Sequence, residues 1–277
     1  MKILLTGCHG QLGQALKTAL TRHELVCLDV DDLDITDTLA VEQRINAEKP
    51  ALVINAAAYT RVDDAESDSK QAWQVNETGP RLLAEATRDI GAVLLHVSTD
   101  YVFDGSGDRP WLESDTPNPL SVYGKSKLAG ERAVQQTNPK HFIVRTAWLY
   151  HASGENFLRT MYHLSERAEV NVVDDQHGSP TNADDLAEAI AQLIETQDYG
   201  IHHLVNAGAA SWYELTCEFY RQLDIKTKVI PVTSDQFPRP APRPANSVLG
   251  SERQSPIVLP DWEAGVGRLV QVMPKDW

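Results

Sequence analysis

Two residues with acid–base chemistry, Tyr123 and Lys127, lie four positions apart in the chain. In a helix this spacing puts both side chains on the same face. A phenol has an unperturbed pKa of ~10, and a neighbouring ammonium lowers that pKa by stabilising the phenolate. The pair is therefore a candidate acid–base centre in which Lys127 adjusts the pKa of Tyr123.

Thr99 follows the apolar segment Val93–Val97, which is typical of a buried strand, so its hydroxyl is expected at the carboxyl end of that strand. When hydride is added to a ketone, negative charge builds on the carbonyl oxygen. Thr99 can hold that oxygen by a hydrogen bond while Tyr123 protonates it. The three residues together predict carbonyl reduction, with Lys127 also holding the ribose of a nicotinamide cofactor.

A glycine-rich loop containing Gly7, Gly10 and Gly13 comes directly after the first apolar segment, Ile3–Leu5. Glycines at these positions allow a tight turn and leave no Cβ between the backbone N–H groups and a pyrophosphate. The helix that starts here adds its positive N-terminus to the same site. The loop therefore predicts dinucleotide binding, with the glycine spacing typical of short-chain dehydrogenases.

Acidic and small residues supply the rest of the predicted cofactor site. Asp29 ends the second predicted strand, where it can accept hydrogen bonds from the adenosine ribose and would repel a 2′-phosphate. Asp34 can contact the adenine amino group while Ile35 packs on the ring. Small residues in the segment 55–60 end the next strand and leave room for the cofactor. NADH and NADPH both stay open as the cofactor, and Asp29 indicates that NADH is accepted.

Strand-like and helix-like segments alternate along the chain, which predicts strands joined by crossover helices. The expected strands are Ile3–Leu5, Glu24–Leu28, Leu52–Ile54, Val93–Val97, Phe142–Thr146 and Val170–Val173. The expected helices are Leu12–Arg22, Leu39–Glu48, Ser69–Asp89, Tyr123–Thr137, Asn156–Arg167, Ala183–Glu195 and Ser211–Leu223. We therefore expect an α/β fold, a Rossmann-type doubly wound parallel sheet with a smaller C-terminal substrate-binding lobe.

The two parts are expected to interleave in sequence. Residues 1–150 form the cofactor domain, residues 168–200 return to it, and residues 151–167 and 201–277 form the substrate-binding lobe. Within that lobe, the Pro-rich stretch 237–244 is expected to be a stiff surface loop.

The composition excludes several classes of partner. The 277 residues carry a formal net charge of −14, which disfavours binding to nucleic acid or to an anionic membrane. The three cysteines are an odd number at irregular spacing, which indicates neither a disulfide framework nor a zinc site. The N-terminal apolar run is too short for a signal peptide, and nowhere do ~18 apolar residues run together. The sequence therefore predicts a cytoplasmic protein that acts on a small molecule.

Motifs spread over nearly the whole chain together resemble the dTDP-4-dehydrorhamnose reductase family. They occupy residues 55–60, 62–66, 98–105, 123–127, 145–150, 175–181 and 243–247. The resemblance implies NAD(P)H-dependent reduction of the C4 ketone of a dTDP-linked 4-keto-6-deoxysugar, dTDP-4-dehydro-L-rhamnose, on the route to dTDP-L-rhamnose for cell-surface polysaccharide. It also implies that Tyr123 is the proton donor and that Lys127 and Thr99 complete the catalytic triad.

The same resemblance assigns binding residues. Cofactor contacts are implied at Gly10, Gln11, Leu12, Asp29, Asp34, Ile35, Ala58, Tyr59, Thr60 and Val97. Sugar-nucleotide contacts are implied at Thr99, Asp100 and Trp148, although Trp148 has the alternative of capping the core. Asn156 is a candidate substrate contact or a helix N-cap. Arg243 is a candidate bidentate ligand of a pyrophosphate or a solvated loop charge.

Some members of this family form a dimer bridged by Mg²⁺ through glutamates in the first helix and near the C-terminus. This sequence has Ala15 and Gln271 at those places. We therefore expect no metal site, while a homodimer stays open.

Two other functions stay open as alternatives. Nucleotide-sugar epimerases and other reductases share the glycine loop and the Tyr–Lys pair, whereas sugar 4,6-dehydratases place a glutamate where this chain has Tyr101, so the base needed to eliminate water is missing. The second alternative is a non-catalytic NAD(P)-binding regulatory subunit. The intact set of Thr99, Tyr123 and Lys127 argues against that role.

Overall fold

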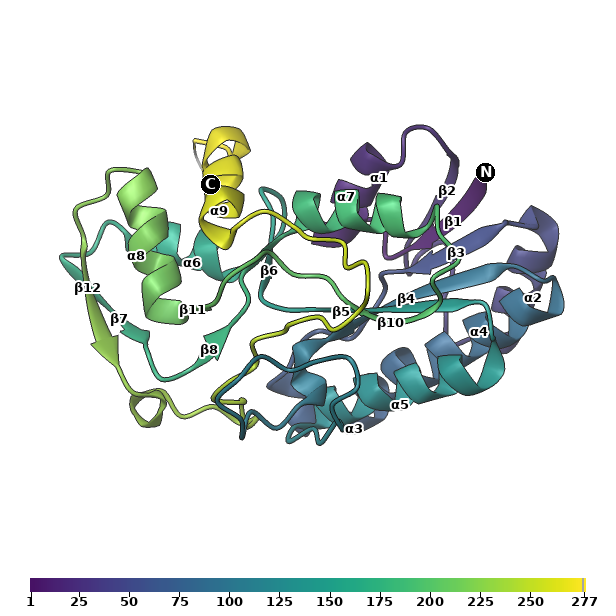
Figure 1. Cartoon of the computed structure of the whole chain (residues 1–277), viewed down its shortest axis with the longest axis horizontal. Coiled ribbons are helices and arrows are strands. Elements are labelled where there is room, and N and C mark those ends of the chain that lie inside the picture. The colour runs from purple at the N-terminus through teal and green to yellow at the C-terminus, as the bar shows by residue number, and fades with distance from the viewer. Residues whose placement is uncertain (276) are drawn as a thin grey trace.

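A six-stranded parallel sheet forms the centre of the protein in the computed structural model, which describes residues 1–275 and 277 (Figure 1). The strands lie in the order β10 (Gly200–His203), β5 (His141–Thr146), β4 (Val93–Thr99), β3 (Leu52–Asn55), β1 (Lys2–Thr6) and β2 (Glu24–Leu28). All neighbouring strands run parallel. All four residues of β3 are buried, as expected for a strand covered on both faces.

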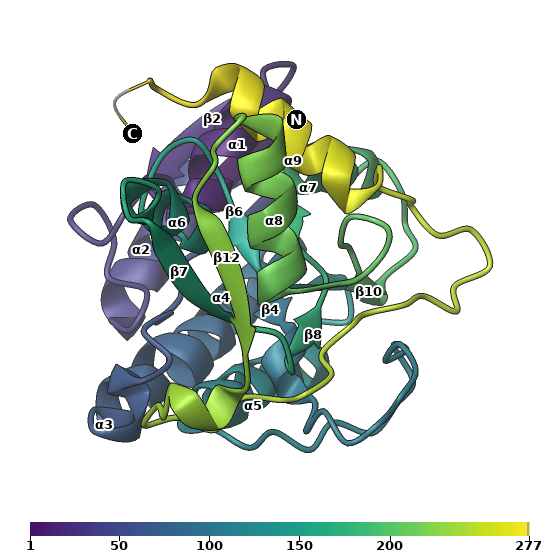
Figure 2. The ribbon, with the colours of Figure 1, turned by 90° about the vertical axis from the view of Figure 1, so that its left-hand side faces the viewer.

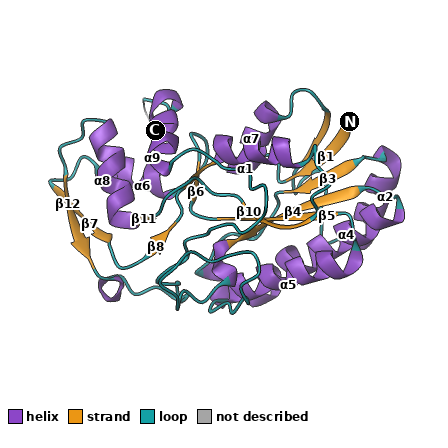
Figure 3. Cartoon of the chain, viewed as in Figure 1, coloured by secondary structure: helices purple, strands orange, loops and turns teal. Residues whose placement is uncertain are grey.

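Helices cover both faces of this sheet (Figure 3). Leu5 and Ile54 pack into the layer formed with α1 (Gln11–Ala19) and α7 (Ala183–Leu193). The opposite layer contains α2 (Thr38–Glu48), α4 (Gly79–Asp89) and α5 (Val122–Thr137). The doubly wound α/β fold expected from the sequence is therefore confirmed. No helix in the described part of the chain is long and apolar enough to cross a membrane.

The strand order reverses direction between β1 and β3, because the chain continues from β1 to one side and from β3 to the other. In sheets of this kind, ligands bind outside the carboxyl ends of the strands at such a reversal. Here the loops that start at Gly7 and at Ala56 meet at this point. The carboxyl ends of the strands face the C-terminal lobe (Figure 1).

The described residues of the C-terminal lobe form three two-stranded sheets and three α-helices, and Figure 2 shows the molecule from the side of this lobe. Its strand pairs are β6 (Leu149–Tyr150) with β9 (Thr181–Asn182), β7 (Glu169–Val173) with β12 (Lys228–Val232), and β8 (His177–Gly178) with β11 (Ala210–Ser211). Its helices are α6 (Phe157–Leu164), α8 (Trp212–Gln222) and α9 (Trp262–Val272). Aromatic residues including Phe219 and Trp262 form its core.

The observed division between the two parts differs from the expected one in two places. Residues 201–203 were expected in the lobe, but together with Gly200 they form the sixth strand of the main sheet, where buried histidines replace the usual apolar residues. Glu169–Val173 was expected with the cofactor domain but pairs with β12 in the lobe. This strand alternates exposed and buried residues, which suits a sheet covered on one face only. Helix α7, from the segment expected to return to the cofactor domain, lies against α1.

The helix expected over Ser69–Asp89 is interrupted. A π-helical turn, Gln74–Thr78, separates α3 (Ser69–Trp73) from α4. Such turns occur frequently at functional sites. The other expected helices and strands are present within a few residues of the expected bounds.

Candidate active site

Helix α5 presents Tyr123 and Lys127 toward the end of β4. Its N-cap is Ser121, whose Oγ accepts a hydrogen bond from the backbone N of Gly124 at 3.1 Å. A Cβ at Gly124 would lie 2.2 Å from the carbonyl oxygen of Tyr101, so glycine is required for α5 to approach this segment. Tyr123 and Lys127 are both buried on one side of the helix.

Thr99 is the last residue of β4 and lies beside Tyr123. Its Oγ1 donates to Oδ1 of Asp100 at 2.9 Å and accepts from the backbone N of Tyr101 at 3.2 Å. A side-chain hydrogen bond also joins Thr99 and Tyr123. The structure therefore brings together two of the three predicted catalytic residues, together with Asp100.

The structure does not show the expected effect of Lys127 on the pKa of Tyr123. Burial raises the pKa of Tyr123 to about 12, and the hydrogen bond with Thr99 only partly opposes this. Instead of lowering that pKa, Lys127 directs Nζ to the carbonyl oxygen of Val97, to which it donates at 2.6 Å. Tyr123 is therefore protonated at neutral pH, which is the state that a proton donor requires.

The pKa of Lys127 is lowered by its surroundings. Its side chain is buried, and burial lowers its pKa to about 8, while the charge of Glu131 one turn later opposes this change. Nζ also lies 3.4 Å from Nε2 of His96 on β4. Lys127 thus titrates much closer to neutral pH than an exposed lysine does.

Asp100 and Tyr101 complete the surroundings of the Tyr123 ring. Burial raises the pKa of Asp100 to about 6, although hydrogen bonds with Ser247 and Thr99 oppose the rise. The ring of Tyr101 meets that of Tyr123 edge to face, with centroids 5.6 Å apart. Burial also raises the pKa of Tyr101 far above its ordinary value. Tyr101 is therefore a neutral phenol at the position where a dehydratase needs a base.

The glycine loop fits a dinucleotide. Gly7 has a φ of 71°, and a Cβ there would lie 2.6 Å from the backbone N of Ala57. A Cβ at Gly13 would lie 2.2 Å from the carbonyl oxygen of Gly7. Helix α1 has Gly10 as its N-cap, without a side-chain hydrogen bond and without an acid in its first turn. Its first N–H groups are thus left for an anionic ligand such as a pyrophosphate.

Asp29 lies at the end of β2 beside this loop. Its carboxylate accepts hydrogen bonds from the backbone N of His9 at 2.8 Å and from that of Val30 at 2.9 Å. Asp34 accepts from the backbone N and the hydroxyl of Thr36. These contacts hold both carboxylates in place. Their predicted roles at the ribose and the adenine remain predictions.

The remaining predicted cofactor residues lie around the same edge. Leu12 and Ile35 are buried, Ala58 is half-buried and Thr60 is exposed. Asn76, in the π-helical turn, holds Tyr59 at both its backbone N and its carbonyl oxygen, at 2.9 and 3.0 Å. The segment after β3 is therefore fixed by a buried amide that sequence reasoning did not find.

A group of possible metal ligands, Cys8, His9 and Asp29, also lies at this edge, with ligand atoms within 4.8 Å of one another. Burial raises the pKa of the Cys8 thiol, so it stays protonated at neutral pH. Ala15 is buried in α1, and Gln271 is exposed on α9. The expectation of no metal stays a prediction.

Asn156 links the lobe to the cofactor loop. Its Oδ1 accepts from the backbone N of Arg159 and caps α6, while its Nδ2 donates to Oε1 of Gln11 at 3.2 Å. In return, Nε2 of Gln11 donates to the carbonyl oxygen of Glu155 at 3.2 Å. The N-cap alternative for Asn156 is confirmed, and its substrate contact remains a prediction.

Trp148 stands in the connection between β5 and β6 in a strained conformation, with a φ of 47°. Its ring stacks on that of Trp212, with centroids 3.4 Å apart and an interplanar angle of 4°. A Cβ at Gly178 would lie 2.3 Å from the Trp148 ring. The indole is thus held between the lobe's helix α8 and β8.

Arg243 is paired rather than solvated. Its Nη1 and Nη2 donate to the two carboxylate oxygens of Asp63 at 2.9 and 3.0 Å, and this contact lowers the pKa of Asp63. Arg243 also forms a hydrogen bond with Tyr101. The Pro-rich stretch 237–244 therefore runs from the lobe to the cofactor domain, where the Asp63 pair anchors it. Binding of a substrate pyrophosphate by Arg243 stays a prediction.

Several residues that organise the site had no role predicted from the sequence. Asn55, Asp63, His96, Asn76 and Trp212 all contact predicted site residues or their immediate neighbours. Asn55 and Asp63 belong to the family motifs at residues 55–60 and 62–66, which was one signal of their importance. A histidine inside the apolar strand Val93–Val97 was a further signal, because a buried polar side chain requires a hydrogen-bonding partner.

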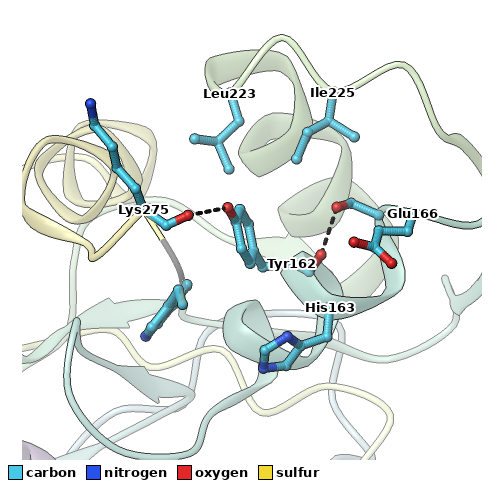
Figure 4. A pocket seen from close by; sticks show the side chains of 8 residues that line it. Tyr162, His163, Glu166, Leu223, Ile225 and Lys275 are labelled. Carbon is cyan, nitrogen blue, oxygen red and sulfur yellow. Dashed lines mark hydrogen bonds between the residues drawn. The ribbon is translucent and has the colours of Figure 1, made fainter.

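Two cavities lie away from these residues. One, of about 560 Å³, lies in the lobe between Tyr162, Leu223, Ile225 and Trp277 (Figure 4). The hydroxyl of Tyr162 donates to the carbonyl oxygen of Lys275 at its edge, at 2.9 Å. The other lies between α1 and α7. Neither is lined by a predicted catalytic or binding residue.

The fold and the site together define a Rossmann-fold oxidoreductase that uses a nicotinamide dinucleotide. More specifically, the chain belongs to the family described as RmlD substrate binding domain, whose model matches residues 1–274. It is 41% identical to the dTDP-4-dehydrorhamnose reductase of Escherichia coli, over 98% of this chain and 97% of that protein. A crystal structure of a dTDP-4-dehydrorhamnose reductase from Clostridium acetobutylicum has 43% identity and a TM-score of 0.96, over 98% of this chain and 99% of that one.

A further similar structure contains a bound cofactor. The dTDP-4-dehydrorhamnose reductase of Bacillus anthracis, in complex with NADP, has 38% identity and a TM-score of 0.95, over 98% of each chain. The family inferred from the sequence motifs is therefore confirmed, and with it the assignment as an NAD(P)H-dependent oxidoreductase. The roles of individual site residues stay predictions.

Proposed function

We propose that this protein reduces the C4 ketone of dTDP-4-dehydro-L-rhamnose to give dTDP-L-rhamnose, with NADH or NADPH as the reductant. The family and its characterised members support this reaction. The single observation in the structure that carries it is the contact between Thr99 and a protonated Tyr123 at the end of β4. This contact lies at the same edge of the sheet as the glycine loop, whose helix α1 has no side-chain N-cap. The regulatory alternative does not require this arrangement.

Each residue has one task in this mechanism. The glycine loop and Asp29 hold the dinucleotide, which supplies hydride to C4 when it is bound. When substrate binds, the Thr99 hydroxyl turns its one proton from Asp100 to the carbonyl oxygen and stabilises the charge that develops there. Tyr123 then transfers its phenolic proton to that oxygen and becomes a phenolate. Arg243 and Trp148 orient the sugar nucleotide.

The test follows the absorbance of the reduced nicotinamide while the purified protein meets dTDP-4-dehydro-L-rhamnose generated in situ, with NADH and NADPH in parallel. We expect substrate-dependent loss of absorbance. Tyr123→Phe should abolish this loss and retain cofactor binding. Tyr162→Phe, which removes a hydroxyl in the lobe cavity (Figure 4), is the matched control and should retain turnover. Cofactor binding without oxidation in the unmodified protein would contradict the proposed substrate.

We also propose where the protein acts in the cell and how it assembles. The reaction consumes nucleotide-activated sugar and reduced nicotinamide, both cytoplasmic compounds, so we place the protein in the cytoplasm. A homodimer would form without a Mg²⁺ bridge, because Ala15 and Gln271 offer no carboxylate. Light scattering after size-exclusion chromatography should therefore give the same mass with and without a chelator, and a chelator-dependent mass would contradict this.

A further inference from the structure

A chain of buried polar side chains crosses the sheet from β1 to α5 and ends at Lys127. Oγ1 of Thr6 donates to Oδ1 of Asn55 at 2.7 Å, and Nδ2 of Asn55 lies 3.1 Å from Nδ1 of His96. Nε2 of His96 in turn lies 3.4 Å from Nζ of Lys127. Asn55 and His96 are fully buried, so the direction of each hydrogen bond matters energetically.

The backbone fixes the direction of this chain. The N–H of Ala57, which can only donate, points at Oδ1 of Asn55 at 3.2 Å. A reversed amide would place the NH₂ group of Asn55 against that N–H, so Nδ2 must face His96. Since Nδ2 can only donate, Nδ1 of His96 must accept. Burial lowers the pKa of His96 far below its ordinary value, so the ring is neutral and its single proton sits on Nε2.

The Nε2–H group of His96 therefore points at Lys127. An ammonium has three donors and no acceptor, so it would meet the N–H of His96 donor to donor. A neutral amine suits both of its neighbours, because it donates to the carbonyl oxygen of Val97 and accepts from Nε2–H. The charge of Glu131 on α5 favours the ammonium form of Lys127. This carboxylate is itself paired with Arg145 of β5.

We propose that Asn55 and His96 are positioning residues for Lys127: Asn55 locks His96 in its Nε2–H tautomer, and this N–H disfavours the ammonium form of Lys127. The lysine then releases a proton at a pH at which an ordinary lysine retains it. Tyr123, one turn earlier on α5, becomes a phenolate in each turnover and must regain a proton. The inference deepens the proposed function, because it concerns the acid–base pair on which that function rests.

The first experiment reads the tautomer directly. Protein labelled with ¹⁵N-histidine and saturated with NADPH is studied by two-bond ¹H–¹⁵N correlation NMR, with His96 assigned from the spectrum of His96→Asn. We expect the Nε2–H pattern for His96 from pH 6 to 9. An Nδ1–H pattern, or a doubly protonated ring in this range, would overturn the inference.

The second experiment measures the pKa of Lys127 from the ¹³Cε shift of labelled lysine, assigned with Lys127→Met. His96→Asn keeps an acceptor for Asn55 but removes the N–H that faces Lys127, and should raise the measured pKa of Lys127 by about 1. His96→Phe keeps a ring without the N–H and should shift that pKa the same way. The basic limb of the pH profile of kcat should move in parallel.

A matched control separates this role from general packing. His202→Asn alters another buried histidine, on β10, whose Nε2 contacts the carbonyl oxygen of Asp198. It should reduce stability and leave the pKa of Lys127 unchanged. Equal pKa values of Lys127 in the unmodified protein and both His96 variants would sink the inference. Failure of the proposed reaction would instead appear as absent nicotinamide oxidation in the unmodified protein, with the NMR titrations unaffected.

Discussion

A buried ion pair anchors the helix that carries Tyr123 and Lys127, and removing one of its charges should unfold the protein at a markedly lower temperature. Glu131 of α5 accepts from Nε and Nη2 of Arg145 on β5, at 2.9 and 2.7 Å. The two side chains are 1% and 2% exposed. Water therefore cannot replace either partner, and Glu131→Gln leaves an uncompensated guanidinium in the core.

The expected cost follows from this burial. Breaking one half of a buried pair costs about 3–5 kcal/mol. For a chain of this size each kcal/mol lowers Tm by roughly 2–4 °C, so Glu131→Gln should lower Tm by roughly 6–20 °C. The double variant Glu131→Leu with Arg145→Met should cost less than the sum of its single changes, because no unpaired charge stays behind.

Thermal unfolding followed by circular dichroism at pH 7 measures these effects. The matched control is Glu218→Gln, which removes the partner of Arg221 in a pair of similar geometry on α8. The Arg221 side chain is 69% exposed, so solvent screens this pair and Glu218→Gln should hardly change Tm. The reasoning is refuted if Glu131→Gln lowers Tm no more than Glu218→Gln, or if the single and double variants are additive.

Three further changes test the cofactor loop, the cofactor preference and the buried acid. Gly7→Ala should abolish NADPH binding in a fluorescence titration, whereas Gly91→Ala, with a similar φ of 73° but nothing within 4 Å of its Cβ, should bind normally; equal loss in both would contradict the steric argument. Asp29→Asn should raise the kcat/KM ratio of NADPH to NADH by roughly fivefold or more, because a like-charge repulsion of ~1–4 kcal/mol is removed; an unchanged ratio would exclude a ribose contact. Since burial raises the pKa of Asp100 to about 6, the folded state retains a proton between pH ~4 and ~6 that the unfolded state releases, and stability falls as pH rises through this window. Asp100→Asn should therefore gain roughly 2–3 kcal/mol over the unmodified protein at pH 8 and little at pH 4, as measured by urea unfolding at both values; a pH-independent difference would contradict this sign.

The elements predicted well are those whose periodicity reflects burial on both faces of the sheet. Strands β3 and β4 were predictable because apolar residues dominate them, with His96 as a single polar residue inside β4. Strand β10 was not, because its two histidines are polar in sequence and buried in the structure. β7 was assigned to the wrong part because a strand's pattern shows which faces are covered and does not identify its partner strand.

The candidate site shows a similar limit. The glycine loop and the Tyr123–Lys127 pair could be predicted, because local spacing alone determines them. The direction of Nζ of Lys127 could not, since it depends on Val97 and His96, some 30 residues away in sequence. The pairing of Arg243 with Asp63 spans 180 residues and likewise had no local signal.

The late position of β10 has a consequence for synthesis on the ribosome. The chain completes β5 at Thr146 and reaches the end of its partner strand only at His203, 57 residues later. At ~5–20 residues per second, the apolar edge of β5 remains without its outer neighbour for roughly 3 to 11 s. Such an edge is a site for mispairing with other nascent chains. The yield of correctly folded protein should therefore depend on translation speed across residues 147–203 and on chaperones that shield β5 during that interval.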